Sequence, residues 1–212
     1  MTDNSIADAT PIRTEAAQRI LTAARHLFTE HGVDGVSIRD IAARADVSKA
    51  NVFHHFGNKA RLYDAVLEDS RLTFDALLVN LADSSRPLDE RLERFTLDHL
   101  HTMLRDPSSV NLFLRQMLNP RGNPQRQRAE ETIGDGLTEL IETLEGALPE
   151  AGQDNRDTAL VLALTLLGGA FMHFQLRDVL PRLDANGTGC DPQRYCAHLV
   201  DLLRSGLTGR NT

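Results

Sequence analysis

The 212-residue sequence predicts an all-α protein in two parts, a small three-helix head and a larger helical body. Apolar residues recur at intervals of three and four along most of the chain, which is the spacing of one face of an α-helix. Prolines and glycines interrupt this pattern between segments. No stretch shows convincingly the alternation of apolar and polar residues that is typical of a β-strand.

The expected boundaries are 1–12 for a disordered arm, 13–58 for the head and 59–212 for the body. The arm, MTDNSIADATPI, is small and polar and lacks the basic start and apolar centre of a secretion signal. Cys190 and Cys196 are therefore expected to be free thiols in a reducing compartment, the cytoplasm, although a redox-sensing pair stays open.

The first helix of the head is expected over 13–31. Thr14 can cap its N-terminus and Gly32 can end it. Its apolar residues recur three or four positions apart, so that one face would pack beneath the helices that follow. These residues are Ala16, Ala17, Ile20, Leu21, Ala24, Leu27 and Phe28.

The segment 37–59, SIRDIAARADVSKANVFHHFGNK, predicts two short helices joined by a tight turn. Ser37 can cap the first helix, and Asp46 suits the turn because aspartate tolerates a left-handed backbone. Ser48 can cap the second helix, 49–56, on which Val52 and Phe56 are four residues apart and are expected to pack inward. A second helix with an outer face of hydrogen-bonding side chains suits recognition of the DNA major groove.

The distribution of charge also favours DNA binding by the head. The whole chain carries −7, but 13–61 holds eight basic and five acidic residues, a local charge of +3. A locally basic tip on an acidic body can still attract phosphate, because the field near a surface depends on nearby charges.

Segment 37–59 resembles the helix-turn-helix of the TetR family of transcriptional regulators. The likeness is close over 13–62 and is one of length and helical layout beyond it. Asp46 stands where glycine is common, and Phe53 stands where the family commonly has tyrosine, whose hydroxyl could contact a phosphate. The residues that carry the resemblance are Ser37-Ile38-Arg39-Asp40-Ile41-Ala42, Val47-Ser48-Lys49-Ala50-Asn51-Val52-Phe53-His54-His55-Phe56 and Asn58-Lys59.

The resemblance implies a ligand-responsive DNA-binding regulator, a homodimer that represses from a palindromic operator and is released by a small-molecule effector. Arg39 and Lys49 can donate to guanine, whereas Asn51 could pair with adenine or hold a phosphate. Ala50 can touch a thymine methyl, and the serines, His55 and Lys59 are expected at phosphates. The full DNA-facing set is Ser37, Arg39, Ser48, Lys49, Ala50, Asn51, Phe53, His54, His55 and Lys59.

The body is expected to begin with a helix over 59–81, which joins it to the head. Breaks at Pro107, at Asn119-Pro120 and at Pro149 then separate three further helices. Val110, Phe113, Leu114 and Met117 are expected to face inward on the second of these, and Ile133, Leu137, Leu140, Ile141 and Leu144 on the third.

The segment 158–176 is apolar on all sides, which predicts a helix buried on all sides. Because it carries polar residues and glycines and the chain has no second span, we expect no membrane insertion. One face would lie in the core and the other against a second subunit, and Gly168-Gly169 would let another helix come close. The predicted dimer surface is 158–178 with the last helix, 192–207, and the dimer would present two recognition helices to two half-sites.

A ligand pocket is expected in the body, where aromatic and apolar residues accompany a few polar groups. The alternative, that the aromatic and methionine side chains are simply core, stays open. The candidates are His99, Met103, Phe113, Gln116, Met117, Phe171, His173 and Phe174.

An enzyme is not expected. The chain has no H-x-x-x-H metal spacing in a helix, no nucleophile elbow and no glycine-rich phosphate loop after a strand. No catalytic residue, metal or cofactor is therefore predicted. The alternative function is a helical dimer that binds protein without sequence-specific DNA binding, in which Lys49→Ala and Arg39→Ala would leave function intact.

Overall fold

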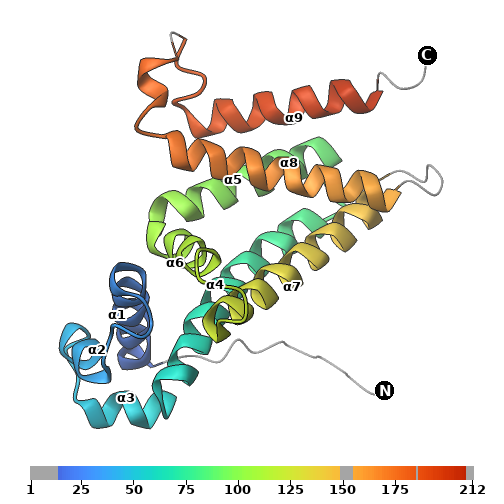
Figure 1. The fold of residues 1–212 in the computed structure, drawn as a ribbon. Coiled ribbons are helices and arrows are strands. Elements are labelled where there is room, and N and C mark those ends of the chain that lie inside the picture. The colour runs from blue at the N-terminus through green and yellow to red at the C-terminus, as the bar shows by residue number, and fades with distance from the viewer. Residues whose placement is uncertain (1–13, 149–154, 185, 209–212) are drawn as a thin grey trace, which may run out of the picture. The chain divides into compact units, whose positions relative to one another are not determined.

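The computed structural model describes residues 14–148, 155–184 and 186–208 (Figure 1). These residues form nine α-helices and a short 3₁₀ helix, η2 (Leu180–Arg182), with no strand among them, which confirms the all-α prediction. The chain divides into two compact units, the first ending at Val66 and the second beginning at Leu67. The arm expected at 1–12 lies outside the described residues.

The first unit contains three helices and the start of a fourth. In order these are α1 (Glu15–His31), α2 (Ile38–Arg44), α3 (Lys49–Phe56) and the first turns of α4 (Lys59–Ala82). Each of the first three begins at a hydroxyl side chain that accepts a hydrogen bond from an amide of the first turn, as the sequence predicts. The caps are Thr14 at 3.2 Å from Ala17, Ser37 at 3.2 Å from Asp40 and Ser48 at 3.1 Å from Asn51.

The apolar face of α1 forms the core of this unit, as expected from its periodicity. Ile20, Leu21 and Phe28 are fully buried, and α1 contacts both α2 and α3. The Phe28 ring meets the buried ring of Tyr63 edge-on, with centroids 5.9 Å apart. This core fixes the two short helices as one rigid unit with a defined outer side.

The second unit is a bundle in which α5 lies against α8 and α9 while α7 lies against α8 (Figure 1). After the rest of α4, its helices are α5 (Leu88–Arg105), α6 (Pro107–Met117), α7 (Pro124–Ala147), α8 (Asn155–Leu176) and α9 (Pro192–Thr208). The element η2, which the sequence did not predict, lies between α8 and α9. The break expected at Pro149 lies outside the described residues.

Helix α8 is buried on one face only. Among the described residues it is the one helix long and apolar enough to cross a membrane by length and composition. Leu162, Leu166 and Phe174 are buried in the bundle, but Val161 is 63% exposed and Met172 is 53% exposed. The described residues therefore leave one face of this helix exposed.

The close approach expected at Gly168-Gly169 occurs at the second glycine. A Cβ atom on Gly169 would lie 2.7 Å from Leu199 Cδ2 of α9, whereas one on Gly168 would meet nothing within 4 Å. The hydroxyl of Tyr195 also donates to the Gly169 carbonyl at 2.9 Å. The missing side chain thus allows α9 to pack directly on the α8 backbone.

Candidate nucleic-acid interface and ligand cavity

Helix α3 presents one open face, which the turn before it orients. Asp46 has φ 52°, the left-handed conformation that the sequence predicts for this turn. Val52 is only 1% exposed and anchors the inner side of α3. Four residues at positions i, i+1, i+4 and i+5 share the exposed side of the helix. They are Lys49, Ala50, Phe53 and His54.

Lys49 and Phe53 act together on that face. The Lys49 ammonium lies 5.6 Å from the centroid of the Phe53 ring, in a cation–π contact, and the ring is 43% exposed. Phe53 lacks the hydroxyl that would contact a phosphate, but its ring supports the cation one turn away. The open face of α3 therefore combines a positive charge with an apolar platform.

The remaining predicted residues surround this face. Ser37 and Arg39 are exposed on α2. Asn51 is half-buried and its Oδ1 is enclosed without a hydrogen-bond partner among the described residues, so a contact with adenine would require the side chain to turn outward. His55 is half-buried, with its ring 6.1 Å from that of Phe56. Phe56, expected to pack inward, is itself only half-buried.

The Ser37 hydroxyl is committed within α2. It donates to the Asp40 carboxylate at 2.6 Å, and the same carboxylate accepts from the Ser37 amide at 3.0 Å. These hydrogen bonds lower the pKa of Asp40. The result is a closed capping box, which fixes the start of α2.

The Lys59 side chain points into the head. Its ammonium donates to the carbonyl oxygens of Val33 at 2.9 Å and Val36 at 3.1 Å. Both carbonyls belong to the segment between α1 and α2. The structure therefore gives Lys59 an internal bracing role beside the phosphate contact predicted for it.

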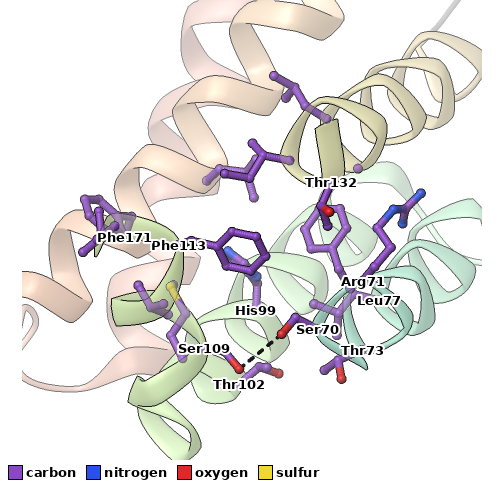
Figure 2. A pocket seen from close by; sticks show the side chains of 18 of the residues that line it. Ser70, Arg71, Thr73, Leu77, His99, Thr102, Ser109, Phe113, Thr132 and Phe171 are labelled. Atoms are coloured by element: carbon purple, nitrogen blue, oxygen red, sulfur yellow. Dashed lines mark hydrogen bonds between the residues drawn. The ribbon is translucent and has the colours of Figure 1, made fainter. Parts of the chain in front are cut away.

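A cavity of about 410 Å³ lies in the second unit, walled by α4 to α8. Its surface is almost wholly apolar. Figure 2 shows the side chains around it, with a 3.4 Å hydrogen bond between Ser70 and Ser109. Five of the eight predicted pocket residues line the cavity, namely His99, Met103, Phe113, Met117 and Phe171.

The cavity explains why α6 and α7 differ from the expected inward faces. On α6 the structure buries Leu112 and Gln116, whereas the four residues expected inward line the cavity. On α7, Ile133 is 42% exposed and also lines it. These apolar side chains face a void rather than close-packed core, so sequence periodicity alone does not separate the two situations.

The cavity wall also includes residues that the sequence analysis missed. Phe74 of α4 lies against Gly136 of α7, where an added Cβ would come 3.5 Å from the ring. A glycine inside a long helix was the available signal, because it indicated a close approach by another group. The other missed wall residues include Ser70, Thr102, Ser109, Thr132, Leu137, Leu164 and Leu167.

The first unit matches a known protein family. The family model described as bacterial regulatory proteins, tetR family, matches residues 20–66. Over these residues, the head is similar to the TetR family. The resemblance seen in segment 37–59 is confirmed.

Curated transcriptional repressors match part of the chain. The HTH-type transcriptional repressor Rv3405c of Mycobacterium tuberculosis is 46% identical over 77 residues, 36% of this chain and 39% of the relative. The transcriptional repressor AcnR of Corynebacterium glutamicum is 30% identical over 94 residues, 44% of this chain and 43% of the relative. This chain therefore spans well under half the length of these curated relatives.

A solved structure matches across both units. NalD, the secondary repressor of the MexAB-OprM multidrug efflux pump in Pseudomonas aeruginosa, is 26% identical with a TM-score of 0.63. The match covers 91% of this chain and 95% of that one. The fold of this chain, including the helical body, is thus similar to that of NalD.

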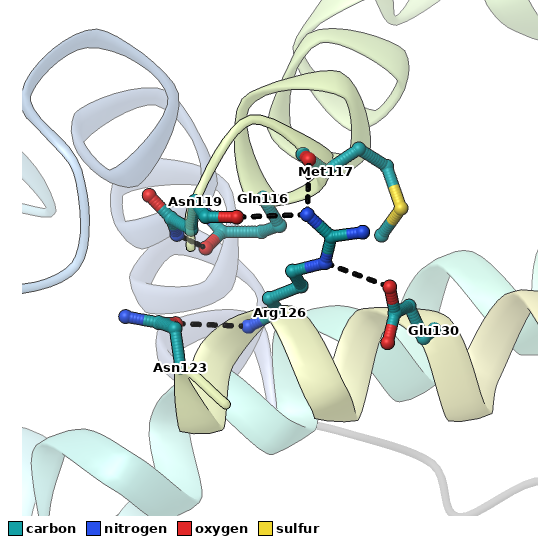
Figure 3. A network of polar contacts seen from close by, with 6 residues as sticks. All are labelled: Gln116, Met117, Asn119, Asn123, Arg126 and Glu130. Carbon is teal, nitrogen blue, oxygen red and sulfur yellow. Dashed lines mark hydrogen bonds and ion pairs between the residues drawn. The ribbon is translucent and has the colours of Figure 1, made fainter. Parts of the chain in front are cut away.

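One predicted pocket residue, Gln116, lies near the end of α6 instead of in the cavity wall. Gln116 is buried, and its Oε1 accepts from the Asn119 side chain at 2.8 Å. Nearby, Arg126 donates to the carbonyls of Met117 at 2.9 Å and Asn119 at 2.8 Å and pairs with Glu130 (Figure 3). This network holds the turn between α6 and α7, so Gln116 lies outside the cavity lining.

His173 and Phe174 also lie outside the lining, on the side of α8 that meets α9. Phe174 belongs to a core cluster with Leu100 and Cys196. The buried His173 ring lies 4.7 Å from that of Tyr195, and burial lowers its pKa. These two side chains pack between α8 and α9. Of the three predicted residues on α8, only Phe171 lines the cavity.

Proposed function

We propose that this protein is a transcriptional repressor that binds a palindromic DNA operator as a homodimer and is released by a small molecule. The observation that carries the proposal is the open face of α3, with Lys49, Ala50, Phe53 and His54 held outward by a buried Val52. A rigid, capped helix of this kind can enter the major groove. Its named repressor relatives support the same function.

Within this proposal Lys49 reads guanine or holds a phosphate, with Phe53 supporting its ammonium. Arg39, exposed on α2, supplies a second cation beside it. Ser48 and His55 flank the same face, and Asn51 would join them after turning outward. The phosphate contacts make the affinity fall with rising salt concentration.

The direct test is fluorescence anisotropy on DNA flanking the gene, at two salt concentrations, with Lys49→Ala beside the unaltered protein. The matched control is Arg182→Ala, which removes one exposed cation from η2 in the body. We expect tight, salt-sensitive binding that Lys49→Ala weakens at least about tenfold and Arg182→Ala leaves unchanged. Equal affinities for the two variants would instead favour a helical dimer that binds protein, as would binding that ignores salt.

The homodimer is proposed through the half of α8 that the chain leaves open, together with α9. Leu160, Val161 and Met172 are exposed on α8, and Leu202 is 73% exposed on α9. A run of exposed apolar side chains on adjacent helices is typical of a protein interface. Val161→Glu should give a monomer in light scattering after gel filtration. Val79→Glu, at a site on α4 that is more exposed still, should remain a dimer.

Effector release is proposed to use the cavity of the second unit. Its volume, about 410 Å³, falls within the range of small-molecule sites. A ligand that binds one spacing of the two heads better than another would shift the dimer away from the operator. Such a regulator would work in the cytoplasm, where its DNA is.

A further inference from the structure

The cavity offers no free cation. Of its 21 lining residues only Arg71 and Asp106 carry a full charge at neutral pH. Arg71 is ion-paired with two carboxylates, those of Asp75 and Glu139, and its side chain is only 16% exposed. An acidic ligand would have to compete with both carboxylates for this guanidinium, at the cost of its own hydration.

The charge of Asp106 is committed to α6, which it caps. Its Oδ1 accepts from the Ser108 amide at 3.2 Å, and its Oδ2 accepts from the Ser109 hydroxyl at 2.8 Å. These hydrogen bonds stabilise the carboxylate at the positive end of a helix. Neither charge of the wall therefore requires a ligand of opposite charge.

The threonine hydroxyls of the wall are turned toward their own helices. Thr73, Thr102 and Thr132 each donate at 2.9 Å to the carbonyl four residues earlier. In this arrangement the hydroxyl hydrogen is used within the helix, and threonine contributes chiefly a methyl group to its surroundings. This accounts for the nearly apolar surface despite the polar residues in the lining.

His99 is the exception. Its ring lies edge-on to Phe74, with centroids 5.6 Å apart, and stacks on Phe95 at 6.1 Å and 6°. It makes no hydrogen bond to the described residues, although a neutral imidazole carries one donor and one acceptor. Burial lowers its pKa to about 4, so the ring is neutral at physiological pH. It is thus a hydrogen-bonding group left without a protein partner inside an apolar cavity.

We propose that the cavity takes an uncharged, largely apolar aromatic molecule with a single hydroxyl group, which hydrogen-bonds to His99. The aromatic walls from Phe74, Phe113 and Phe171 match a ring system, and the paired Arg71 selects against carboxylates. This inference rests on the proposed function for its regulatory meaning, but the chemistry of the cavity can be tested by binding alone.

The first test uses the full-length protein and the uncharged fluorescent probe N-phenyl-1-naphthylamine. Three competitors of one scaffold, 1-naphthol, naphthalene and 1-naphthoate, then displace it. We expect 1-naphthol to bind about three- to tenfold more tightly than naphthalene, as one net hydrogen bond allows. We expect 1-naphthoate to bind at least about a hundredfold more weakly than 1-naphthol. A preference for 1-naphthoate, or no probe binding, would overturn the proposal.

Two variants assign the result to His99 and to the cavity. His99→Leu should abolish the advantage of 1-naphthol over naphthalene while keeping naphthalene affinity within about twofold, and His101→Leu, on the exposed side of α5, should change neither. Thr132→Trp should fill the cavity and remove probe binding. Unchanged probe binding by Thr132→Trp would place the probe elsewhere and overturn the proposal, as would an unchanged preference in His99→Leu.

Operator binding separates this inference from the proposed function. If 1-naphthol binds as expected but leaves operator affinity unchanged, the cavity chemistry stands and the effector role fails. If a carboxylic acid releases the operator and 1-naphthol does not enter the cavity, the effector role stands and the inference fails.

Discussion

The Lys59 ammonium donates a 2.9 Å hydrogen bond to the carbonyl of Val33, 26 residues earlier in the chain. A second hydrogen bond to Val36 closes the segment between α1 and α2 onto the start of α4. Only two lysines occur in the sequence, and the structure uses them in opposite ways. Lys49 extends from the exposed face of α3, whereas Lys59 braces the inside of the head.

Lys59→Met should therefore destabilise the head by about 1–3 kcal/mol, because it removes the donor to two partly buried carbonyls. Lys49→Met is the matched control and should change stability by less than about 0.5 kcal/mol, since its side chain is exposed. Thermal unfolding followed by circular dichroism measures both. Equal unfolding temperatures for the two variants would show that Lys59 does not stabilise the head through these hydrogen bonds.

The two adjacent glycines of α8 should respond oppositely to alanine. Gly169→Ala should destabilise the body by about 1–2 kcal/mol, because its Cβ would meet Leu199 Cδ2 at 2.7 Å and the Tyr195 hydroxyl at 3.2 Å, so that both side chains must shift. Gly168→Ala should stabilise it by about 0.5–1 kcal/mol, because alanine favours a helix and the site is open. Urea unfolding compares them. If both variants changed stability in the same direction, Gly169 would not be packed against Leu199 more closely than Gly168 is against any neighbour.

Acid should destabilise the body through His99. Burial lowers its folded-state pKa to about 4 from an ordinary 6.5, so the unfolded chain binds the extra proton between these values. The neutral ring therefore contributes its full stabilisation above pH 6.5. The free energy of unfolding falls as the pH drops toward 4, by about 2 kcal/mol at pH 5 relative to pH 7. His99→Gln should show a smaller loss over the same interval, measured by urea unfolding at both pH values. His173, whose pKa burial also lowers, should contribute in the same direction.

The two cysteines should differ sharply in reactivity. Both are free thiols, with Cys190 exposed and Cys196 buried at α9. Burial raises the pKa of Cys196 to about 12, so its thiolate is scarce at neutral pH. A disulfide reagent such as Ellman's should therefore modify one thiol in the native protein and two in urea. Cys190→Ser should abolish the native reaction, and a variant that still reacted at Cys196 would contradict its burial.

Local sequence signals predicted most of the head. Thr14, Ser37 and Ser48 cap the helices that they were expected to cap, and Asp46 adopts the left-handed backbone expected of it. Each of these features depends on residues within one turn of the chain, so the sequence carries the necessary information locally. The internal role of Lys59 was missed because its partners lie more than twenty residues away.

The cavity was harder to predict, because its residues come from five helices. His99, Met103 and Phe113 were chosen because aromatic and apolar side chains with a few polar groups are typical of ligand pockets, and they line the cavity. The same criterion selected Gln116, His173 and Phe174, which lie outside its wall. Helical periodicity tells which side of a helix turns away from water. It does not tell whether that side meets a neighbouring helix or an empty space.

The sequence by itself determined the helical class, the helix ends and the outward face of α3, because capping and periodicity act over a few residues. Tertiary structure alone decided that Arg71 is neutralised by Asp75 and Glu139, that His99 is left unpartnered in the cavity wall, and that only half of α8 is covered. These properties depend on groups brought together from distant parts of the chain, and burial and pairing exist only once the helices have packed.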